Sequence, residues 1–191
     1  MKCRHCGTPL VHSFLDLGFA PPSNAYLSVS DLSRPEVTFP LRLRVCDRCW
    51  LVQTEDFASA DQLFRADYAY FSSTSTSWLA HAARYCVRMI DELSLTPKSH
   101  VVEIAANDGY LLKNFVAAGI PCLGVEPTAG TAAAAESLDI PIIRDFFSSE
   151  LAQQMRGQGQ GADLLIGNNV LAHVPDINDF CRGLKYLLNP G

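Results

Sequence analysis

The chain has 191 residues, of which 48% are hydrophobic and 18% are charged, and its formal net charge is −5. At about 100–200 residues per domain, this length predicts one or two domains. The apolar fraction excludes a wholly disordered chain, and no run approaches the roughly 20 consecutive apolar residues of a membrane span. The acidic balance lacks the basic surface typical of nucleic-acid-binding proteins, so we expect neither nucleic acid nor a membrane as a partner.

Cysteine usage indicates a reducing compartment. The chain has seven cysteines, an odd number that argues against a closed disulfide framework. Its first residues lack the apolar core of a secretory signal peptide. We therefore expect a cytoplasmic protein whose cysteines are thiols or metal ligands.

Two Cys-x-x-Cys pairs form the strongest motif of the N-terminal part. Cys3 and Cys6 open the chain, and Cys46 and Cys49 follow with 39 residues between the pairs. Two such turns supply four thiolates for tetrahedral Zn²⁺, although the gap exceeds the roughly 15–20 residues of a compact zinc ribbon. Because four protein ligands leave no open position, the predicted zinc is structural rather than catalytic. Two redox pairs, two disulfides or unliganded core thiols are the alternatives.

Residues 1–57 are predicted to form one small zinc-binding module. The alternating hydropathy of residues 39–45 predicts a strand, and residues 50–53 predict its partner, which places the zinc at the tip of a hairpin. Residues 16–27 contain two prolines and a glycine and are expected to be irregular. So small a module has too little hydrophobic core to fold without an additional cross-link, and the bound metal would provide it.

A helical segment interrupted by a polar turn is predicted over residues 58–98. Apolar residues recur at intervals of three and four through residues 78–93, which indicates an amphipathic helix that Pro97 would close. The hydroxyl-rich run 72–77 offers N-caps for its start. The hydroxyls and aromatic rings of residues 68–73 suit a polar ligand, and ordinary capping with core aromatics is the alternative.

From residue 99 onward the pattern changes to strands that alternate with helices. The expected strands are 101–105, 122–125, 140–143 and 163–167, and the expected helices are 110–118, 128–138, 148–155 and 179–188. This alternation predicts an α/β fold with a parallel sheet, a Rossmann-like domain over residues 99–191. Ligands of such sheets bind at the carboxyl ends of the strands.

Acidic residues at these strand ends indicate which ligand binds. The loop 103–109 lacks the first two glycines of a dinucleotide fingerprint, and Glu103 and Asp108 would repel a phosphate but suit a cation. Glu126 can accept both hydrogen bonds of a ribose diol, and Asp145 can accept from an adenine amino group with Phe146 against the ring. A ribose diol, an adenine and a cation without a phosphate describe S-adenosylmethionine (SAM). Solvated strand ends are the alternative for Glu103 and Glu126.

A polar loop, residues 168–176, follows the fourth strand, where an enzyme of this fold presents groups to the methyl and its acceptor. His173 is a titratable candidate near that chemistry. A loop histidine bonded to the backbone is the alternative.

Taken together, the motifs resemble the sugar-nucleotide C-methyltransferases of deoxysugar biosynthesis. These are zinc-containing, SAM-dependent enzymes that make branched sugars of the mycarose and tetronitrose kind in antibiotic pathways. The matching elements are Cys3/Cys6/Cys46/Cys49 and residues 15–18, 68–73, 103–112, 124–127 and 168–175. The resemblance implies a zinc-binding N-terminal domain, a SAM-binding domain and a C-terminal Rossmann-like domain that helps to hold the nucleotide sugar.

The resemblance also implies individual site residues. Catalytic roles fall to His173 and Tyr68, and the roles of Tyr68 and Tyr70 are exchangeable. The implied cofactor-binding residues are Tyr70, Ser72, Glu103, Ala105, Asn107, Gly109, Tyr110, Leu111, Glu126, Pro127, Asp145, Phe146, Asn168 and Asn169. The metal ligands are the four cysteines of the two pairs.

The implied reaction is methylation of C-3 in a dTDP-4-keto-deoxysugar. The ketone acidifies that C–H, a base removes the proton, a donor holds the enolate oxygen, and the carbanion attacks the sulfonium methyl group. General acid–base help of this kind is typically worth about 10²–10⁴-fold. The family carries its principal base and sugar-binding domain in segments after the matched motifs. We therefore expect an N-terminal fragment with weak or no SAM affinity, no turnover, and self-association through an apolar strand edge at 163–167.

Two other function classes fit the same features. One is a non-catalytic zinc-ribbon interaction module on a degenerate nucleotide fold, which saturable SAM binding would exclude. The other is a SAM methyltransferase that acts on a different small molecule or on a protein side chain, with the zinc module as a recognition domain.

Overall fold

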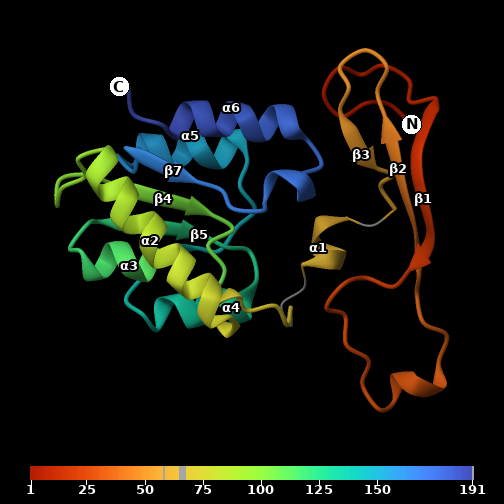
Figure 1. The fold of residues 1–191 in the computed structure, drawn as a ribbon, viewed down its shortest axis with the longest axis horizontal. Coiled ribbons are helices and arrows are strands. Elements are labelled where there is room, and N and C mark those ends of the chain that lie inside the picture. Colours follow the sequence, from red (N-terminus) through yellow and green to blue (C-terminus); the bar gives the residue numbers. More distant parts are fainter. Residues whose placement is uncertain (58, 65–67, 191) are drawn as a thin grey trace.

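The computed structural model describes residues 1–57, 59–64 and 68–190. An antiparallel sheet built from the N-terminal residues lies beside a larger α/β unit, and a short helix, α1 (Ala60–Leu63), lies between them (Figure 1). Positions 58 and 65–67 of the predicted helical segment, and position 191 of the predicted Rossmann-like domain, fall outside the described residues.

The N-terminal sheet has the strand order β1-β2-β3, where β1 is His12–Ala20, β2 is Phe39–Val45 and β3 is Val52–Thr54. Strands β2 and β3 pair in antiparallel register, and the second cysteine pair occupies the turn between them. This confirms the predicted hairpin with the cysteines at its tip. A 3₁₀ turn, η1 (Asp31–Ser33), interrupts the long connection between β1 and β2.

Strand β1 contradicts the expectation of an irregular segment from residue 16. The pairing with β2 shifts register between Asp16 and Phe19, where Gly18 takes a φ of +76° and its N–H donates to Asp16 Oδ1 at 2.9 Å. A bulge of this kind lets a glycine sit inside a paired strand. The irregular path begins only after Ala20, at the two prolines that cannot donate to a ladder.

Helix α2 (Thr76–Glu92) follows a 3₁₀ turn, η2 (Ser72–Thr74), and confirms the predicted amphipathic helix. Ser75 caps it by accepting from Trp78 N at 3.3 Å. The predicted end at Pro97 is wrong. Ser94 takes a φ of +51°, and Leu95 N donates to Ile90 O at 2.9 Å. This hydrogen-bonded reversal ends the helix at Glu92, before the proline is reached.

The larger sheet is parallel and has the order β6-β5-β4-β7. Its strands are β4 (Val101–Ile104), β5 (Cys122–Val125), β6 (Ile142–Ile143) and β7 (Leu164–Ile166). Strand β4 is central, since the chain adds β5 and β6 on one side of it and β7 on the other. The carboxyl end of β4 is therefore the topological switch point, where ligands of open α/β sheets bind.

Helices cover both faces of this sheet. The helices are α2, α3 (Leu112–Ala117), α4 (Ala129–Glu136), α5 (Ser149–Gly157) and α6 (Ile177–Leu187), with a 3₁₀ turn, η3 (Leu171–His173), before α6. One buried cluster joins Val101 to Cys86 of α2 and Phe115 of α3. The other joins Val102 to residues of α5 and α6. Adjacent strand residues thus point to opposite layers, and Figure 1 shows α2 and α3 on one side and α5 and α6 on the other.

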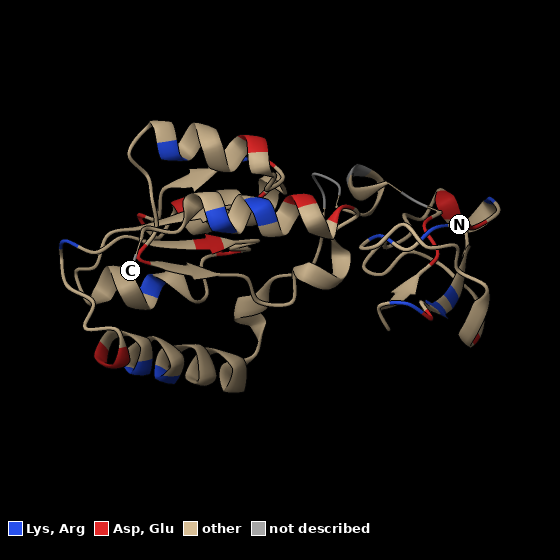
Figure 2. Cartoon of the chain, turned by 90° about the horizontal axis from the view of Figure 1, so that it is seen from above, with Lys and Arg blue, Asp and Glu red and all other residues tan. Residues whose placement is uncertain are grey.

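The charged residues are distributed over both units. Blue and red segments are interspersed in Figure 2, and acidic residues outnumber basic ones, 20 to 15. Within the described residues, no helix combines the length and the apolarity that crossing a membrane requires.

Gly124 in β5 generates a stability prediction. A Cβ there would meet Ile142 Cδ1 at 2.5 Å and Ala106 Cβ at 2.8 Å. We expect Gly124→Ala to lower the free energy of unfolding by about 1–3 kcal/mol, because overpacking displaces these neighbours. Urea denaturation measures the change.

Gly157→Ala is the matched control, because a Cβ on Gly157 meets nothing within 4 Å. It should leave stability unchanged or raise it by up to about 1 kcal/mol. Equal stability of the two variants would contradict the packing argument.

Candidate functional site

The four paired cysteines converge on one point. Cys3 Sγ lies 3.5 Å from Cys49 Sγ, Cys6 Sγ lies 3.5 Å from Cys46 Sγ, and all four sulfur atoms lie within 4.8 Å of one another. Four sulfurs around a tetrahedral Zn²⁺ at about 2.3 Å would lie about 3.8 Å apart. The donor set and its spacing fit zinc.

The two Cys-x-x-Cys turns have the same backbone geometry. Gly7 N donates to Cys3 O and Trp50 N donates to Cys46 O, both at 3.0 Å. Gly7 has a φ of +73° and Trp50 a φ of +64°. A glycine is expected at such a position, whereas a tryptophan there is strained. The equivalence of Trp50 with Gly7 therefore emerges only from the structure.

The first pair is set up to carry negative charge. Burial raises the pKa of Cys3. Hydrogen bonds from the backbone amides of Cys6 and His5 and from the side chain of Gln53 outweigh this effect and lower the pKa to about 6. Gln53 Nε2 donates to Cys3 Sγ at 3.4 Å. The close sulfur contacts run between the two pairs rather than within each pair, and all four cysteines are free thiols. This arrangement favours a shared metal over two local disulfides.

A second cluster lies at the carboxyl end of β4. The loop that follows has three left-handed residues, Ala105, Asn107 and Gly109, with φ values of +56°, +51° and +75°. At Gly109 a Cβ would also lie 2.5 Å from Ile140 Cδ1, so only glycine fits there. Strained loops of this kind persist where surrounding contacts enforce them, and they concentrate at ligand sites.

The segment around residue 72 supplies those contacts. Ser72 N donates to Asn107 Oδ1 at 2.9 Å, and Asn107 Nδ2 donates to Tyr70 O at 3.1 Å. Ser73 N donates to Asp108 Oδ2 at 2.9 Å. The structure thus brings Tyr70 and Ser72 to the β4 loop, where they bond through their backbones. One oxygen of Asp108 is engaged in the same contact.

Glu103 is fully buried, and neither carboxylate oxygen has a hydrogen-bond partner among the described residues. Burial raises its pKa well above the ordinary value of 4.5, and the negative charge of Glu126 raises it further. The nearby Tyr110 and Asn168 lower it, and Asn168 Nδ2 donates to Tyr110 Oη at 3.2 Å. A buried carboxylate without a partner is costly unless a cation compensates it. The site therefore fits a positively charged ligand.

Glu126 at the end of β5 is also buried, at 4% exposure, so the alternative of solvated strand ends is wrong for both acids. Its two oxygens accept from Asn107 N and Thr128 N, each at 2.9 Å, and one accepts from the Thr128 hydroxyl as well. A carboxylate has about four acceptor positions. Three of these positions are occupied, so Glu126 fixes the β4 loop and retains about one acceptor position for a ligand hydroxyl.

The remaining predicted cofactor residues lie in different surroundings. Asp145 and Phe146 are exposed after β6, and Asp145 Oδ1 accepts from Phe146 N at 2.7 Å. Asn169 is exposed after β7 with a φ of +53°. Leu111 lies in the hydrophobic core, so the structure does not bring its side chain to the cluster. Pro127 continues the chain from Glu126 at the same sheet edge.

The two predicted catalytic side chains both contact the ring of Phe64. Its ring centroid is 5.4 Å from that of Tyr68 and 5.8 Å from that of His173. Burial raises the pKa of Tyr68, and Asn24 Nδ2 donates to its hydroxyl at 3.5 Å. His173 is exposed, and among the described residues no backbone group bonds its imidazole, contrary to the alternative reading.

A cavity of about 110 Å³ reaches His173 from the zinc module. Arg4 and Asp56 line it on one side, and Ala172, His173 and Pro175 line it on the other. The N-terminal module therefore contributes a wall to the space beside His173. Sequence patterns gave no signal for Arg4 or Asp56, because their contact joins segments more than fifty residues apart.

Comparison with known proteins supports the zinc module and the resemblance. Residues 3–64 match the family described as "Putative zinc binding domain". The chain is 30% identical over 189 residues to the C-methyltransferase NovU of Streptomyces niveus, a match that covers 99% of this chain and 45% of NovU. The chain thus spans about half the length of this curated relative. These matches support a zinc-binding N-terminal module and a similarity to a C-methyltransferase.

Two solved structures are similar over part of the chain. A SAM-dependent methyltransferase from Anabaena variabilis is 21% identical, with a TM-score of 0.47 over 58% of this chain and 49% of the other. The magnesium protoporphyrin IX methyltransferase ChlM from Synechocystis, with SAM bound, is 17% identical, with a TM-score of 0.47 over 59% and 57%.

The cysteine geometry predicts one bound zinc per chain. Metal analysis of the purified protein should give about one equivalent, and chelation should unfold residues 1–57, because little else holds them. Cys49→Ser should lose most of the metal, whereas Cys181→Ser, at an exposed cysteine outside the cluster, should keep it. A metal-free protein of ordinary stability would contradict the prediction.

Glu103 predicts a pH dependence of stability. Because the folded state holds its proton above the ordinary pKa of 4.5, the ligand-free protein should lose stability as the pH rises through the range above that value. Glu103→Gln should flatten this slope, measured by urea denaturation from pH 5 to about pH 8.

The control is Glu136→Gln, whose exposed carboxylate pairs with Arg144 and has a lowered pKa. Its effect should be small and confined to acidic pH. An unchanged slope in Glu103→Gln would show that Glu103 is ionised in the folded protein.

Proposed function

We propose that this chain carries the zinc-binding and SAM-binding parts of a C-methyltransferase that acts at C-3 of a dTDP-4-keto-deoxysugar. The observation that carries the proposal is the buried, unpaired carboxylate of Glu103 beside Glu126, at the switch point of a parallel sheet. Similarity to a named C-methyltransferase supports the reaction class. We assign residues 1–57 to the zinc module, 58–98 to the helical segment and 99–191 to the SAM-binding domain.

The residues at the sheet edge fit SAM. Its cationic methionine part would compensate Glu103, and one hydroxyl of its ribose diol would use the remaining acceptor position of Glu126. The remaining proposed contacts are Tyr70, Ser72, Ala105, Asn107, Gly109, Tyr110, Leu111, Pro127, Asp145, Phe146, Asn168 and Asn169. When bound, SAM supplies an electrophilic methyl group.

Tyr68 and His173 are the proposed proton-handling groups of this chain. The raised pKa of Tyr68 keeps its phenol protonated at neutral pH, so it can donate a hydrogen bond to the oxygen of a developing enolate. The imidazole of His173 lines the cavity and is the proposed group that accepts or donates a proton there. Phe64 contacts both rings and so holds the two groups near one another.

Two alternatives remain as outcomes of the test. A methyltransferase with a different small-molecule or protein acceptor would bind SAM but leave the keto-sugar unchanged. A non-catalytic zinc interaction module would not bind SAM at all.

The test supplies SAM with a ¹³C-labelled methyl group and a dTDP-4-keto-deoxysugar. It uses the chain alone and the chain fused to the part of NovU that the match leaves uncovered. Mass spectrometry of the sugar should show one labelled methyl group at C-3 with the fusion. SAM binding by the fusion without labelled sugar would favour a different acceptor, and absence of SAM binding by the fusion would contradict the proposal.

Glu126→Ala should weaken SAM binding about tenfold or more. A hydrogen bond to a buried charged group is worth about 1.5–3 kcal/mol. The variant also removes the acceptor of Asn107 N, which fixes the β4 loop. Calorimetric titration with SAM measures the affinity. Glu136→Ala, an exposed carboxylate on α4, is the matched control and should bind like the unmodified protein. Unchanged affinity in Glu126→Ala would remove this residue from the site.

A further inference from the structure

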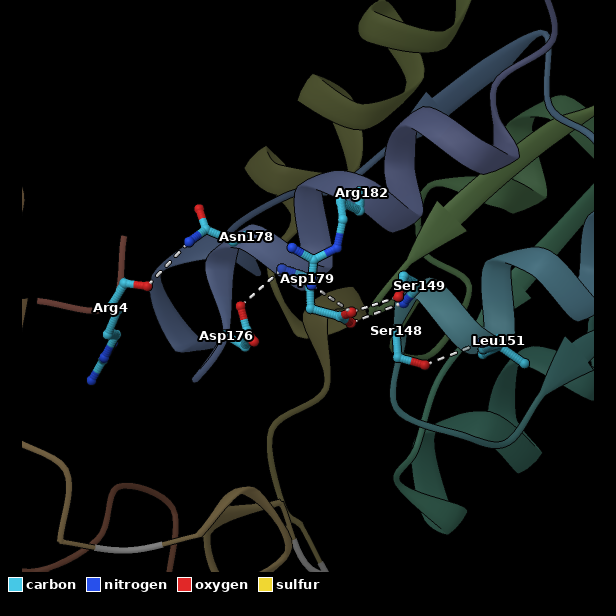
Figure 3. Close-up of polar contacts among 8 residues, drawn as sticks. All are labelled: Arg4, Ser148, Ser149, Leu151, Asp176, Asn178, Asp179 and Arg182. Atoms are coloured by element: carbon cyan, nitrogen blue, oxygen red, sulfur yellow. Dashed lines mark hydrogen bonds and ion pairs between the residues drawn. The ribbon is translucent and has the colours of Figure 1, made fainter. Parts of the chain in front are cut away.

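The first turn of α6 is bonded to the first cysteine turn. Asn178 Nδ2 donates to His5 O at 2.8 Å. It also donates to Arg4 O at 3.5 Å, the contact drawn in Figure 3. Asn178 Oδ1 lies 2.8 Å from His5 Nδ1, which donates to it. One side-chain amide therefore engages both residues that lie between Cys3 and Cys6.

The same turn is fixed to the α/β unit by different groups. Asp176 Oδ1 caps the helix by accepting from Asp179 N at 2.8 Å. The Asp179 carboxylate accepts from Ser149 N at 2.9 Å and Ser149 Oγ at 2.5 Å, and Arg182 donates to it at 3.1 Å (Figure 3). The start of α6 thus connects the start of α5 with the zinc module.

The position of the first cysteine turn depends on the proposed metal site. Arg4 N donates to Gln53 Oε1 at 3.0 Å, and Gln53 Nε2 donates to Cys3 Sγ. The Arg4 guanidinium pairs with Asp56 and donates to Thr54 O at 3.1 Å. These bonds join Arg4 to the hairpin that carries the other two cysteines. When the sulfurs share one ion, both turns are held as one body.

His173 lies five positions before Asn178 in the chain, and it shares a cavity with Arg4. The loop therefore lines the cavity at His173 and, five residues later, is hydrogen-bonded through Asn178 to the cysteine turn. That turn contributes Arg4 to the lining of the same cavity. If this tie is broken, the loop keeps only its hydrogen bonds on the α/β side.

We infer that Asn178 is a positioning residue that couples zinc occupancy to the placement of the loop 168–176, and so of His173. The importance of His173 rests on the proposed function, whereas the coupling itself does not. The zinc is then more than a local staple, because its removal releases a loop more than one hundred residues away in the sequence.

Hydrogen–deuterium exchange of the full 191-residue chain tests the coupling without SAM or sugar. In the zinc-loaded protein, Asn178→Ala should increase the amide exchange of residues 170–178 about tenfold, because hydrogen bonds that close the segment are lost. Zinc content should stay at one equivalent, and exchange in β4 should not change. Chelation should increase exchange of residues 170–178 in the unmodified protein but add little in Asn178→Ala.

Arg182→Ala is the matched control. It removes a polar contact of the same helix that does not reach the cysteine turn, so chelation should still increase exchange of residues 170–178. Asn178→Ala with the exchange of the unmodified protein would overturn the inference. So would equal responses to chelation with and without Asn178. Failure of SAM binding would contradict the proposed function but leave these exchange results unaffected.

Discussion

The N-terminal module depends on holding four sulfur atoms at one point. Among its described residues, the fully buried ones are Cys3, Cys46 and Gln53, and Gln53 itself bonds to Cys3 Sγ. A sheet of three short strands cannot be stable on so little core. The free energy that folds the module must come largely from metal–thiolate bonds. The cavity beside His173 is lined in part by Arg4 and Asp56 of this module, so its shape also depends on the metal.

The α/β unit has the opposite character, with a large core and an unfavourable interaction placed at its functional edge. Glu103 sits on the central strand, where its neighbours Val102 and Ile104 are core residues, so it cannot reach water. Glu126 and the β4 loop surround it with further polar groups that are already bonded to each other. An isolated buried carboxylate lowers stability in the absence of a ligand, and a cationic ligand recovers that loss on binding. The buried carboxylate therefore lowers the stability of the ligand-free protein and raises the affinity for a cationic ligand.

The two units meet through few groups, but those groups adjoin both proposed centres. Asn178 contacts the cysteine turn, and Phe64 contacts both Tyr68 and His173. Polar contacts across such an interface add orientation rather than much net stability, because each replaces bonds to water. Their role is to fix where the loop after β7 lies relative to the zinc module.

The sequence by itself determined the features that depend on local pattern. The Cys-x-x-Cys spacing predicted the metal cluster, and the strand–helix alternation predicted the parallel sheet with acids at its strand ends. Tertiary structure decided the rest, because the contacts join distant segments and leave no periodic signal. Examples are the bulge at Gly18 that extends β1, the bonds from Ser72 and Ser73 to the β4 loop, and the pairing of Asn178 with His5. Hydrophobic periodicity reports which face of an element is buried, whereas a single polar bond between distant segments depends on how the finished units pack.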